Sequence, residues 1–164
     1  MTQERKITIS WDDPETSARD PKKISGLDYL TAIREGRVNP PPIARLTGYR
    51  IKDVDQGRAV FELEPFEYHY NPFSTLHGGI SSTILDTAMT AAVLSTLPIG
   101  FFCYTVELKV NFVRPITIDT GVVESHGCVI HSGRNLATAE GRITDGEEKL
   151  YAHSMGTFAV MKAK

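Results

Sequence analysis

The segment 80–97 most constrains the fold, because it is the one long helical pattern in the chain. The glycine pair Gly78–Gly79 precedes it, and Pro98 follows it, so both ends of a helix are marked. Its apolar residues recur on one broad face at about 100° per residue. They include Ile80, Ile84, Leu85, Ala88 and Ala92. We expect a serine, Ser81 or Ser82, to cap its first turn.

The rest of the chain is predicted to be mainly β-structure. Residues 106–112 alternate apolar and polar side chains with a period of two. The turn pair Asp145–Gly146 indicates a hairpin. The chain is expected to enter the sheet from Ile43, after a short helix over 26–35 and a proline-rich connection. Further strands are predicted over 58–64, 121–131, 135–144 and 149–161. One long helix and a mainly antiparallel sheet make an α+β protein.

Length and composition exclude several classes of protein. The 164 residues fit one domain, predicted over 26–164 after a polar arm over 1–25. The 18 Lys and Arg against 20 Asp and Glu give a net charge of -2, which argues against a nucleic-acid partner. No apolar run exceeds four residues, and the start lacks a signal peptide, so we expect a soluble cytoplasmic protein without membrane association. Two cysteines make neither a disulfide framework nor a zinc site, so no metal is expected.

The entrance of the long helix carries the most unusual residues. Glycines at a helix start present bare backbone amides beside the positive end of the helix dipole. The Gly78 amide could therefore polarise a carbonyl and hold an oxyanion. Asp86, two turns further on, could act as a general base or a nucleophile. Taken singly, each also fits an ordinary role, as a tight turn or a solvated carboxylate. Met89 and Val93 lie on the same, less apolar side of the helix as Asp86.

Other candidates have equally plain structural alternatives. His77 could be a base, but a loop-shaping role is favoured. Asn71 offers an amide donor beside Pro72, where turn residues are also common. Thr105 could orient a water, and Arg134 in a turn could meet a phosphate. No G-x-S-x-G elbow and no glycine-rich nucleotide loop is present, which disfavours serine hydrolases of that type and nucleotide-binding proteins.

Taken together, Asn-x5-His-Gly-Gly-x6-Asp over residues 71–86 resembles the PaaI-like group of hotdog-fold acyl-CoA thioesterases. Residues 104–115 and 57–65 look like two strands of the same group, and the resemblance covers roughly 27–161. It implies a curved antiparallel sheet wrapped around one central helix, and a homodimer that in some members pairs into a homotetramer. The implied activity is hydrolysis of an acyl-CoA to a free acid and CoA, without a cofactor.

The resemblance also implies roles for single residues. The Gly78 amide would polarise the thioester carbonyl with help from Asn71, and Asp86 would activate water or attack directly. His77 would complete the loop, and Thr105 would orient the water. Substrate contacts would come from Gly79, Phe73 and Arg134, the last with the CoA phosphates. Many relatives have glycine where this chain has Ser74, so a positive φ there would strain the serine.

The spacing of Gly78 and Asp86 predicts a shared site. Eight helical positions separate them by about 12 Å, too far for one thioester carbon to contact both groups of one chain. Each site would therefore combine Gly78 of one subunit with Asp86 of the other, which requires an obligate homodimer. The partner would also cover the apolar residues near Asp86.

Two competing functions remain open. The first is a hotdog domain that binds acyl-CoA without hydrolysing it, although such a binder needs no carboxylate. The second is a dehydratase or hydratase, which His77-Gly78-Gly79 fits less well. The acyl group is not specified by the sequence, because core packing explains Tyr68, Tyr70, Phe73 and Phe102 equally well.

Overall fold

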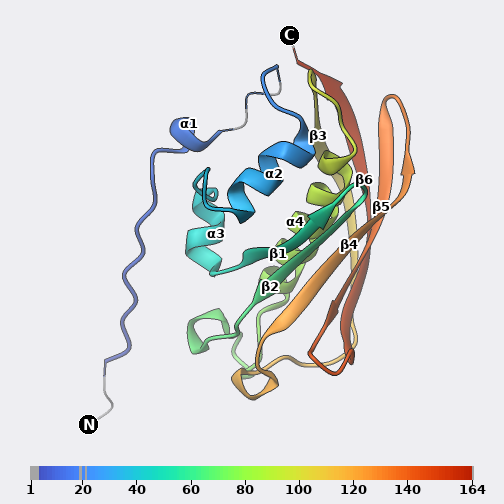
Figure 1. The fold of residues 1–164 in the computed structure, drawn as a ribbon. Helices are drawn as coiled ribbons and strands as arrows, with labels where there is room; N and C mark the ends of the chain where they lie inside the picture. Colours follow the sequence, from blue (N-terminus) through green and yellow to red (C-terminus); the bar gives the residue numbers. More distant parts are fainter. Residues whose placement is uncertain (1–3, 19, 21, 164) are drawn as a thin grey trace.

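The computed structural model describes residues 4–18, 20 and 22–163. A six-stranded antiparallel sheet wraps around the central helix α4, and two short helices lie on the side of α4 away from β5 and β6 (Figure 1). The helices are α1 (Pro14–Ser17), α2 (Gly26–Arg34), α3 (Pro42–Thr47) and α4 (Gly78–Ser95), with 3-10 turns at Glu67–His69 and Ile118–Thr120. The α+β prediction is confirmed.

The strands run in the order β1-β2-β4-β5-β6-β3, so β1 and β3 are the two edges of the sheet. All five neighbouring pairs are antiparallel. The four strands predicted after the long helix are confirmed. The bounds are β1 (Arg50–Asp55), β2 (Arg58–Leu63), β3 (Phe101–Phe112), β4 (Val123–Ser132), β5 (Leu136–Thr144) and β6 (Leu150–Lys162).

The core fills the space between α4 and the concave face of the sheet. Leu85 and Ala88 of α4 are fully buried among residues of β2, β4 and β5. Met89 and Val93 are fully buried against a second group that includes Phe158. A helix that is apolar around most of its circumference needs such cover on more than one side. The expectation that a partner subunit covers Met89 and Val93 is therefore wrong, since their own chain buries them.

The prediction that the sheet begins at Ile43 is also wrong, because residues 42–47 form α3. Pro42 occupies the first turn, where its missing amide is unneeded and its fixed φ suits the helix. Gly48 ends α3 in the left-handed conformation, with φ of 79°. The sheet then begins at Arg50. The short helix predicted over 26–35 is confirmed as α2, with Ser25 as its N-cap.

The N-terminal cover, defined here as residues 26–49 with α2 and α3, is fastened to the body at two points. The Gly26 amide donates to the Leu97 carbonyl at 3.3 Å, and a β-carbon on Gly26 would lie 1.8 Å from the Leu94 carbonyl oxygen. At the other end of α2, Arg34 pairs with Asp53 of β1 at 2.8 Å. The cover is thus seated directly on α4 and β1. In the arm, α1 is capped by the Asp13 side chain.

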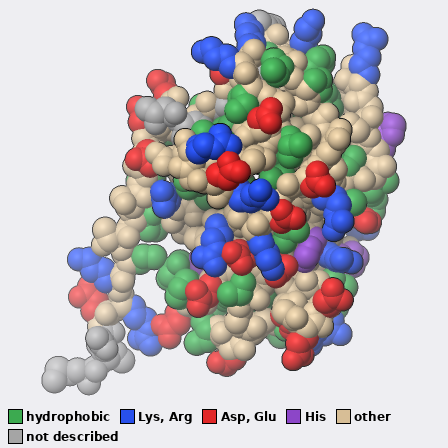
Figure 2. Space-filling view, in the orientation of Figure 1, with side chains coloured by type: hydrophobic (Ala, Val, Ile, Leu, Met, Phe, Trp, Pro, Cys, Tyr) green, Lys and Arg blue, Asp and Glu red, His purple; other side chains and the backbone are tan. Residues whose placement is uncertain are grey.

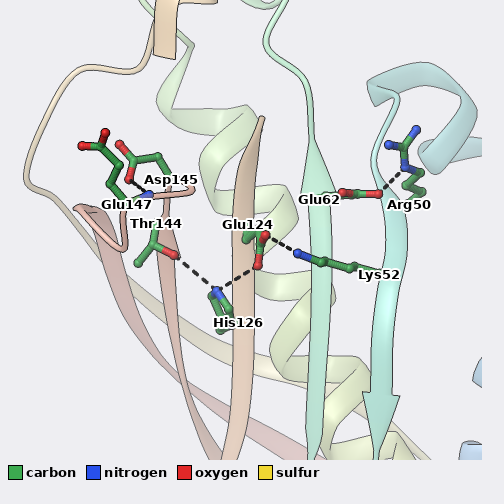
Figure 3. Close-up of polar contacts among 8 residues, drawn as sticks. All are labelled: Arg50, Lys52, Glu62, Glu124, His126, Thr144, Asp145 and Glu147. Atoms are coloured by element: carbon green, nitrogen blue, oxygen red, sulfur yellow. Dashed lines mark hydrogen bonds and ion pairs between the residues drawn. The ribbon is translucent and has the colours of Figure 1, made fainter. Parts of the chain in front are cut away.

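The convex face of the sheet carries charged residues in pairs. Arg50 of β1 pairs with Glu62 of the neighbouring β2, and Lys52 of β1 reaches across β2 to pair with Glu124 of β4 (Figure 3). The His126 ring lies 3.3 Å from the Thr144 hydroxyl and 3.6 Å from Glu124. Burial and nearby guanidinium groups lower the pKa of His126. Acidic and basic side chains are interspersed over the face that Figure 2 shows.

The β5–β6 connection differs in detail from the predicted hairpin turn. The Asp145 carboxylate accepts hydrogen bonds from the amides of Glu147 and Lys149, each at 3.0 Å. The positive φ falls on Glu148, at 60°, and not on Gly146. An aspartate side chain that closes its own turn thus replaces the two-residue turn. Among the described residues, no helix has the length and apolar character needed to cross a membrane.

Candidate active site

Helix α4 begins at Gly78, two residues before its predicted start at Ile80. The reason is that His77 caps the helix: its Nδ1 accepts a hydrogen bond from the Gly79 amide at 2.8 Å. The prediction of a cap by Ser81 or Ser82 is wrong, because both lie inside the helix, and the Ser82 hydroxyl donates to the Gly78 carbonyl. With His77 satisfying Gly79, the amide of Gly78 is left without an acceptor among the described residues. An unpaired N–H at a helix start is a ready oxyanion donor.

The loop before α4 is held by the Asn71 side chain. Its Oδ1 accepts from the amides of Phe73 and Thr75, at 2.8 and 3.3 Å, and its Nδ2 donates to the Thr75 hydroxyl at 2.9 Å. Asn71 therefore orders the loop, and one N–H of its amide is left for a ligand. Phe73 stands at the tip of this loop with 85% of its surface exposed.

Ser74 adopts a φ of 58°, so the strain anticipated from the sequence is present in this loop. A left-handed conformation costs a residue with a β-carbon about 1–2 kcal/mol, whereas glycine adopts it freely.

We expect Ser74→Gly to raise the free energy of unfolding by about 0.5–1 kcal/mol, because relief of the strain exceeds the entropy that glycine loses on folding. Chemical denaturation of the two proteins measures the difference. Ser74→Ala is the control, since it removes the hydroxyl but keeps the β-carbon, and it should give no gain. Equal stabilisation by both variants would contradict the explanation.

Asp86 is half-buried in the middle of α4, where Thr105 of β3 holds it. The Thr105 hydroxyl donates to Asp86 Oδ1 at 2.7 Å and lies 3.2 Å from the Thr90 hydroxyl. The register of β3 against β6 shifts between Thr105 and Glu107, which makes Val106 the extra residue of a bulge. Bulges redirect neighbouring side chains, and this one lies next to the residue that contacts Asp86.

Two separate cavities contain the groups expected to act on the thioester. The first, of about 610 Å³, is lined by Asp86, Thr87 and Thr90 of α4, by the N-terminal cover and by β1. The second, of about 390 Å³, is lined by Gly78, Asn71 and the segment 112–116. Within one chain, the predicted base and the predicted oxyanion donor therefore do not share a cavity.

The structure also brings forward residues that the sequence did not single out. Tyr49 is buried in the wall of the first cavity, which Thr87 of α4 also lines. Burial and the nearby Asp86 carboxylate raise the pKa of Tyr49. Thr90 follows Asp86 by one helical turn, and that spacing could have indicated it. No signal in the sequence marks Tyr49, because only tertiary packing, including its edge-to-face contact with Phe61 of β2, places it here.

The remaining predicted residues lie apart from these cavities. Gly79 donates its amide to His77, so a substrate would have to displace that bond to use it. Arg134 is exposed in the β4–β5 turn. That turn contacts the C-terminal end of α4 through Ser132 and Thr96, at the opposite end of the helix from Gly78. Among the described residues, no cluster of three His, Cys, Asp or Glu side chains is placed to hold a metal.

The sequence is similar to known thioester hydrolases. The Thioesterase superfamily model matches residues 73–152. The 1,4-dihydroxy-2-naphthoyl-CoA hydrolase of Listeria monocytogenes is 31% identical over 117 residues, which is 71% of this chain and 94% of the relative. Human acyl-coenzyme A thioesterase 13 is 30% identical over 82 residues, or 49% of this chain and 56% of that protein.

Solved structures show the same architecture. A thioesterase family protein from Silicibacter pomeroyi superposes with a TM-score of 0.74 at 26% identity, over 82% of this chain and 99% of that one. The E. coli PaaI protein from the phenylacetic acid degradation operon gives a TM-score of 0.74 at 20% identity, over 85% and 99% of the two chains. Sheet, central helix and relatives agree, and the chain belongs to the thioesterase superfamily with a PaaI-like hotdog fold.

Proposed function

We propose that the protein hydrolyses an acyl-CoA thioester to a carboxylic acid and CoA. The observation that carries this proposal is the Asp86 carboxylate, fixed by Thr105 at the wall of a large cavity, together with the unpaired Gly78 amide at a helix start. Relatives named for acyl-CoA hydrolysis support the same reaction class. A domain that only bound acyl-CoA would have no use for this carboxylate.

In the proposed reaction, Asp86 accepts a proton from a water whose oxygen attacks the thioester carbon. The negative charge that develops on the carbonyl oxygen is held by the Gly78 amide, with Asn71 beside it. The C–S bond then breaks, and the CoA thiolate leaves and takes up the proton. In the alternative, Asp86 itself attacks and forms an acyl-Asp86 anhydride, which mass spectrometry of the quenched enzyme would detect. Neither route calls for a metal.

The site is proposed to form between two copies of the chain. Eight positions of the continuous helix α4 separate Gly78 and Asp86 by about 12 Å, and they line different cavities. β3 is an edge strand: it pairs with β6 along one side, and no described strand pairs with its other side. Two of its apolar residues, Tyr104 and Val106, are 64% and 60% exposed. Such an open apolar edge favours pairing with a second chain. Antiparallel pairing of two β3 strands would bring one chain's α4 beside the other's.

The test is complementation between two inactive variants. Gly78→Pro removes the amide at the first helical position, where proline suits the backbone, and should lower kcat about 10²–10³-fold. Gly78→Ala is the control, because it also adds a β-carbon, 3.1 Å from the Phe112 ring, but keeps the backbone N–H. Its kcat should fall less than that of Gly78→Pro. Mixing subunits of Gly78→Pro and Asp86→Asn should restore activity.

The expected restoration is about a quarter of the wild-type activity. Random mixing makes about half of the dimers mixed, and each mixed dimer carries one site with both groups intact, as its two-fold symmetry requires. Subunits are mixed in mild denaturant, refolded and assayed for thiol release. Activity no greater than that of the separate variants would contradict a site shared between chains.

A further inference from the structure

The 610 Å³ cavity beside Asp86 has walls from two parts of the chain. The N-terminal cover forms one side, and Thr87, Ala91 and Leu94 of α4 form the other. Because Asp86 itself lines this cavity, a thioester carbon placed at the carboxylate can extend its acyl substituent into the cavity. We propose that this cavity receives the acyl group, and that the group is a bulky, mainly apolar one, of medium-chain or aromatic type. The inference rests on the proposed function.

The chemistry of the walls favours an apolar occupant. They are mostly hydrocarbon, with Leu30, Ile33, Ala44, Ile51, Phe61 and Ala91 among them. Two hydroxyls beside the carboxylate are already engaged: Thr105 donates to Asp86, and Thr90 lies 3.2 Å from the Thr105 hydroxyl. The arginines at the cavity are paired with carboxylates or exposed to solvent: Arg34 with Asp53, Arg50 with Glu62, and Arg45 in water. Among the described residues that line this cavity, no fully buried side-chain polar atom is left without a hydrogen-bond partner.

The size of the cavity excludes a two-carbon acyl group as its natural occupant. Ligand pockets usually measure about 300–1,000 Å³ and enclose most of a drug-sized molecule. An acetyl group would leave most of these apolar walls in contact with water. A medium chain or a ring would remove that surface from water, which favours its binding.

The cavity is built before the ligand arrives. Gly26 fixes one end of α2 through its hydrogen bond to Leu97, and the Arg34–Asp53 pair fixes the other end to β1. Tyr49 packs edge-to-face on Phe61, with ring centroids 5.7 Å apart, and so ties the end of the cover to β2. A preformed pocket selects its ligand by shape, because it does not adjust at low cost.

The N-terminal cover lies outside the segment that identifies the family. The family model begins at residue 73, whereas the cover spans 26–49 and the β1 wall follows it. Gly78 and Asp86 therefore come from the matched segment, and most of one cavity wall comes from residues before it. Acyl selectivity is thus assigned to the cover and reaction chemistry to α4 and its preceding loop.

Two substitutions in the cavity should change selectivity in opposite directions. Ala91→Leu fills the space from α4 and should lower kcat/KM for octanoyl-CoA and benzoyl-CoA at least tenfold, with acetyl-CoA changed less than threefold. Ile33→Ala enlarges the cavity from α2 and should raise the preference for decanoyl-CoA over hexanoyl-CoA. The control is Ala159→Leu on β6, the same substitution at a half-buried site away from the cavity, and it should leave the profile unchanged.

The outcomes separate this inference from the proposed function. Two results would overturn the acyl site alone, both with thiol release by the wild-type protein. One is an acyl preference that neither cavity variant alters, and the other is a preference for acetyl-CoA. If the wild-type protein releases thiol from no acyl-CoA, the proposed function fails. In that case octanoyl-CoA should still raise the melting temperature of the wild-type protein and leave that of Ala91→Leu unchanged. If octanoyl-CoA does not shift the melting temperature of the wild-type protein, the acyl site is overturned too. Ile33→Ala carries the test if Ala91→Leu does not fold.

Discussion

Replacing Asp86 by asparagine is expected to lower kcat for acyl-CoA hydrolysis by about 10²–10⁴-fold, the usual contribution of a general base. Asparagine has the same shape, and its Oδ1 can still accept the hydrogen bond from the Thr105 hydroxyl, which lies 2.7 Å from the carboxylate in the wild-type protein. The fold and the assembly should therefore be unchanged. What is lost is the negative charge that takes the proton from water.

The measurement is the initial rate of thiol release over a range of substrate concentrations. Asp12→Asn is the matched control, because it removes an exposed carboxylate from the N-terminal arm and should leave kcat within experimental error. KM should change little if binding energy comes mainly from the acyl group and CoA. A kcat for Asp86→Asn within a few fold of wild type would rule out the proposed chemistry.

Gly127→Ala is expected to lower the free energy of unfolding by about 3 kcal/mol, at the upper end of the usual cost of overpacking. A β-carbon on this β4 residue would lie 2.2 Å from the Ala88 carbonyl oxygen of α4 and 2.7 Å from the Met89 amide nitrogen. Both obstacles are backbone atoms of a buried helix, so neither can rotate away as a side chain would. The helix and the strand would have to separate.

Urea unfolding of both proteins gives the difference. Gly146→Ala is the control, because no atom lies within 4 Å of its added β-carbon and its φ is not positive. It should change stability by less than about 0.5 kcal/mol. If the two variants were equally stable, the close approach of α4 to β4 would be wrong.

The order of elements could be predicted because the signals are local. A single long apolar segment with glycines before it and proline after it defines α4, and strict alternation defines β3. The Asn71-to-Asp86 motif likewise indicated the family, since its spacing depends on one loop and one helix. Each of these patterns lies within about twenty consecutive residues.

The structural details that could not be predicted from the sequence depend on contacts between distant segments. α3 was missed because a proline run predicts extended chain, although Pro42 equally suits a first helical turn. The cap by His77 was missed because serine is the more common cap. The burial of Met89 and Val93 by their own chain follows from the packing of α4 against β3, β5 and β6. The shared site and the assembly stay predictions until subunits are mixed.

The contact of Gly26 with the end of α4 has a consequence for which N-terminal segments this chain can accept. The first turn of α2 meets the last turn of α4 with no space for a β-carbon, and its amide binds the carbonyl of Leu97. The N-terminal segment of a relative could replace that of this chain only if it carried glycine at the position of Gly26. Exchange of the cover by recombination is therefore limited to donors that preserve this one residue, whereas point substitutions elsewhere in α2 and in α3 are free of that limit.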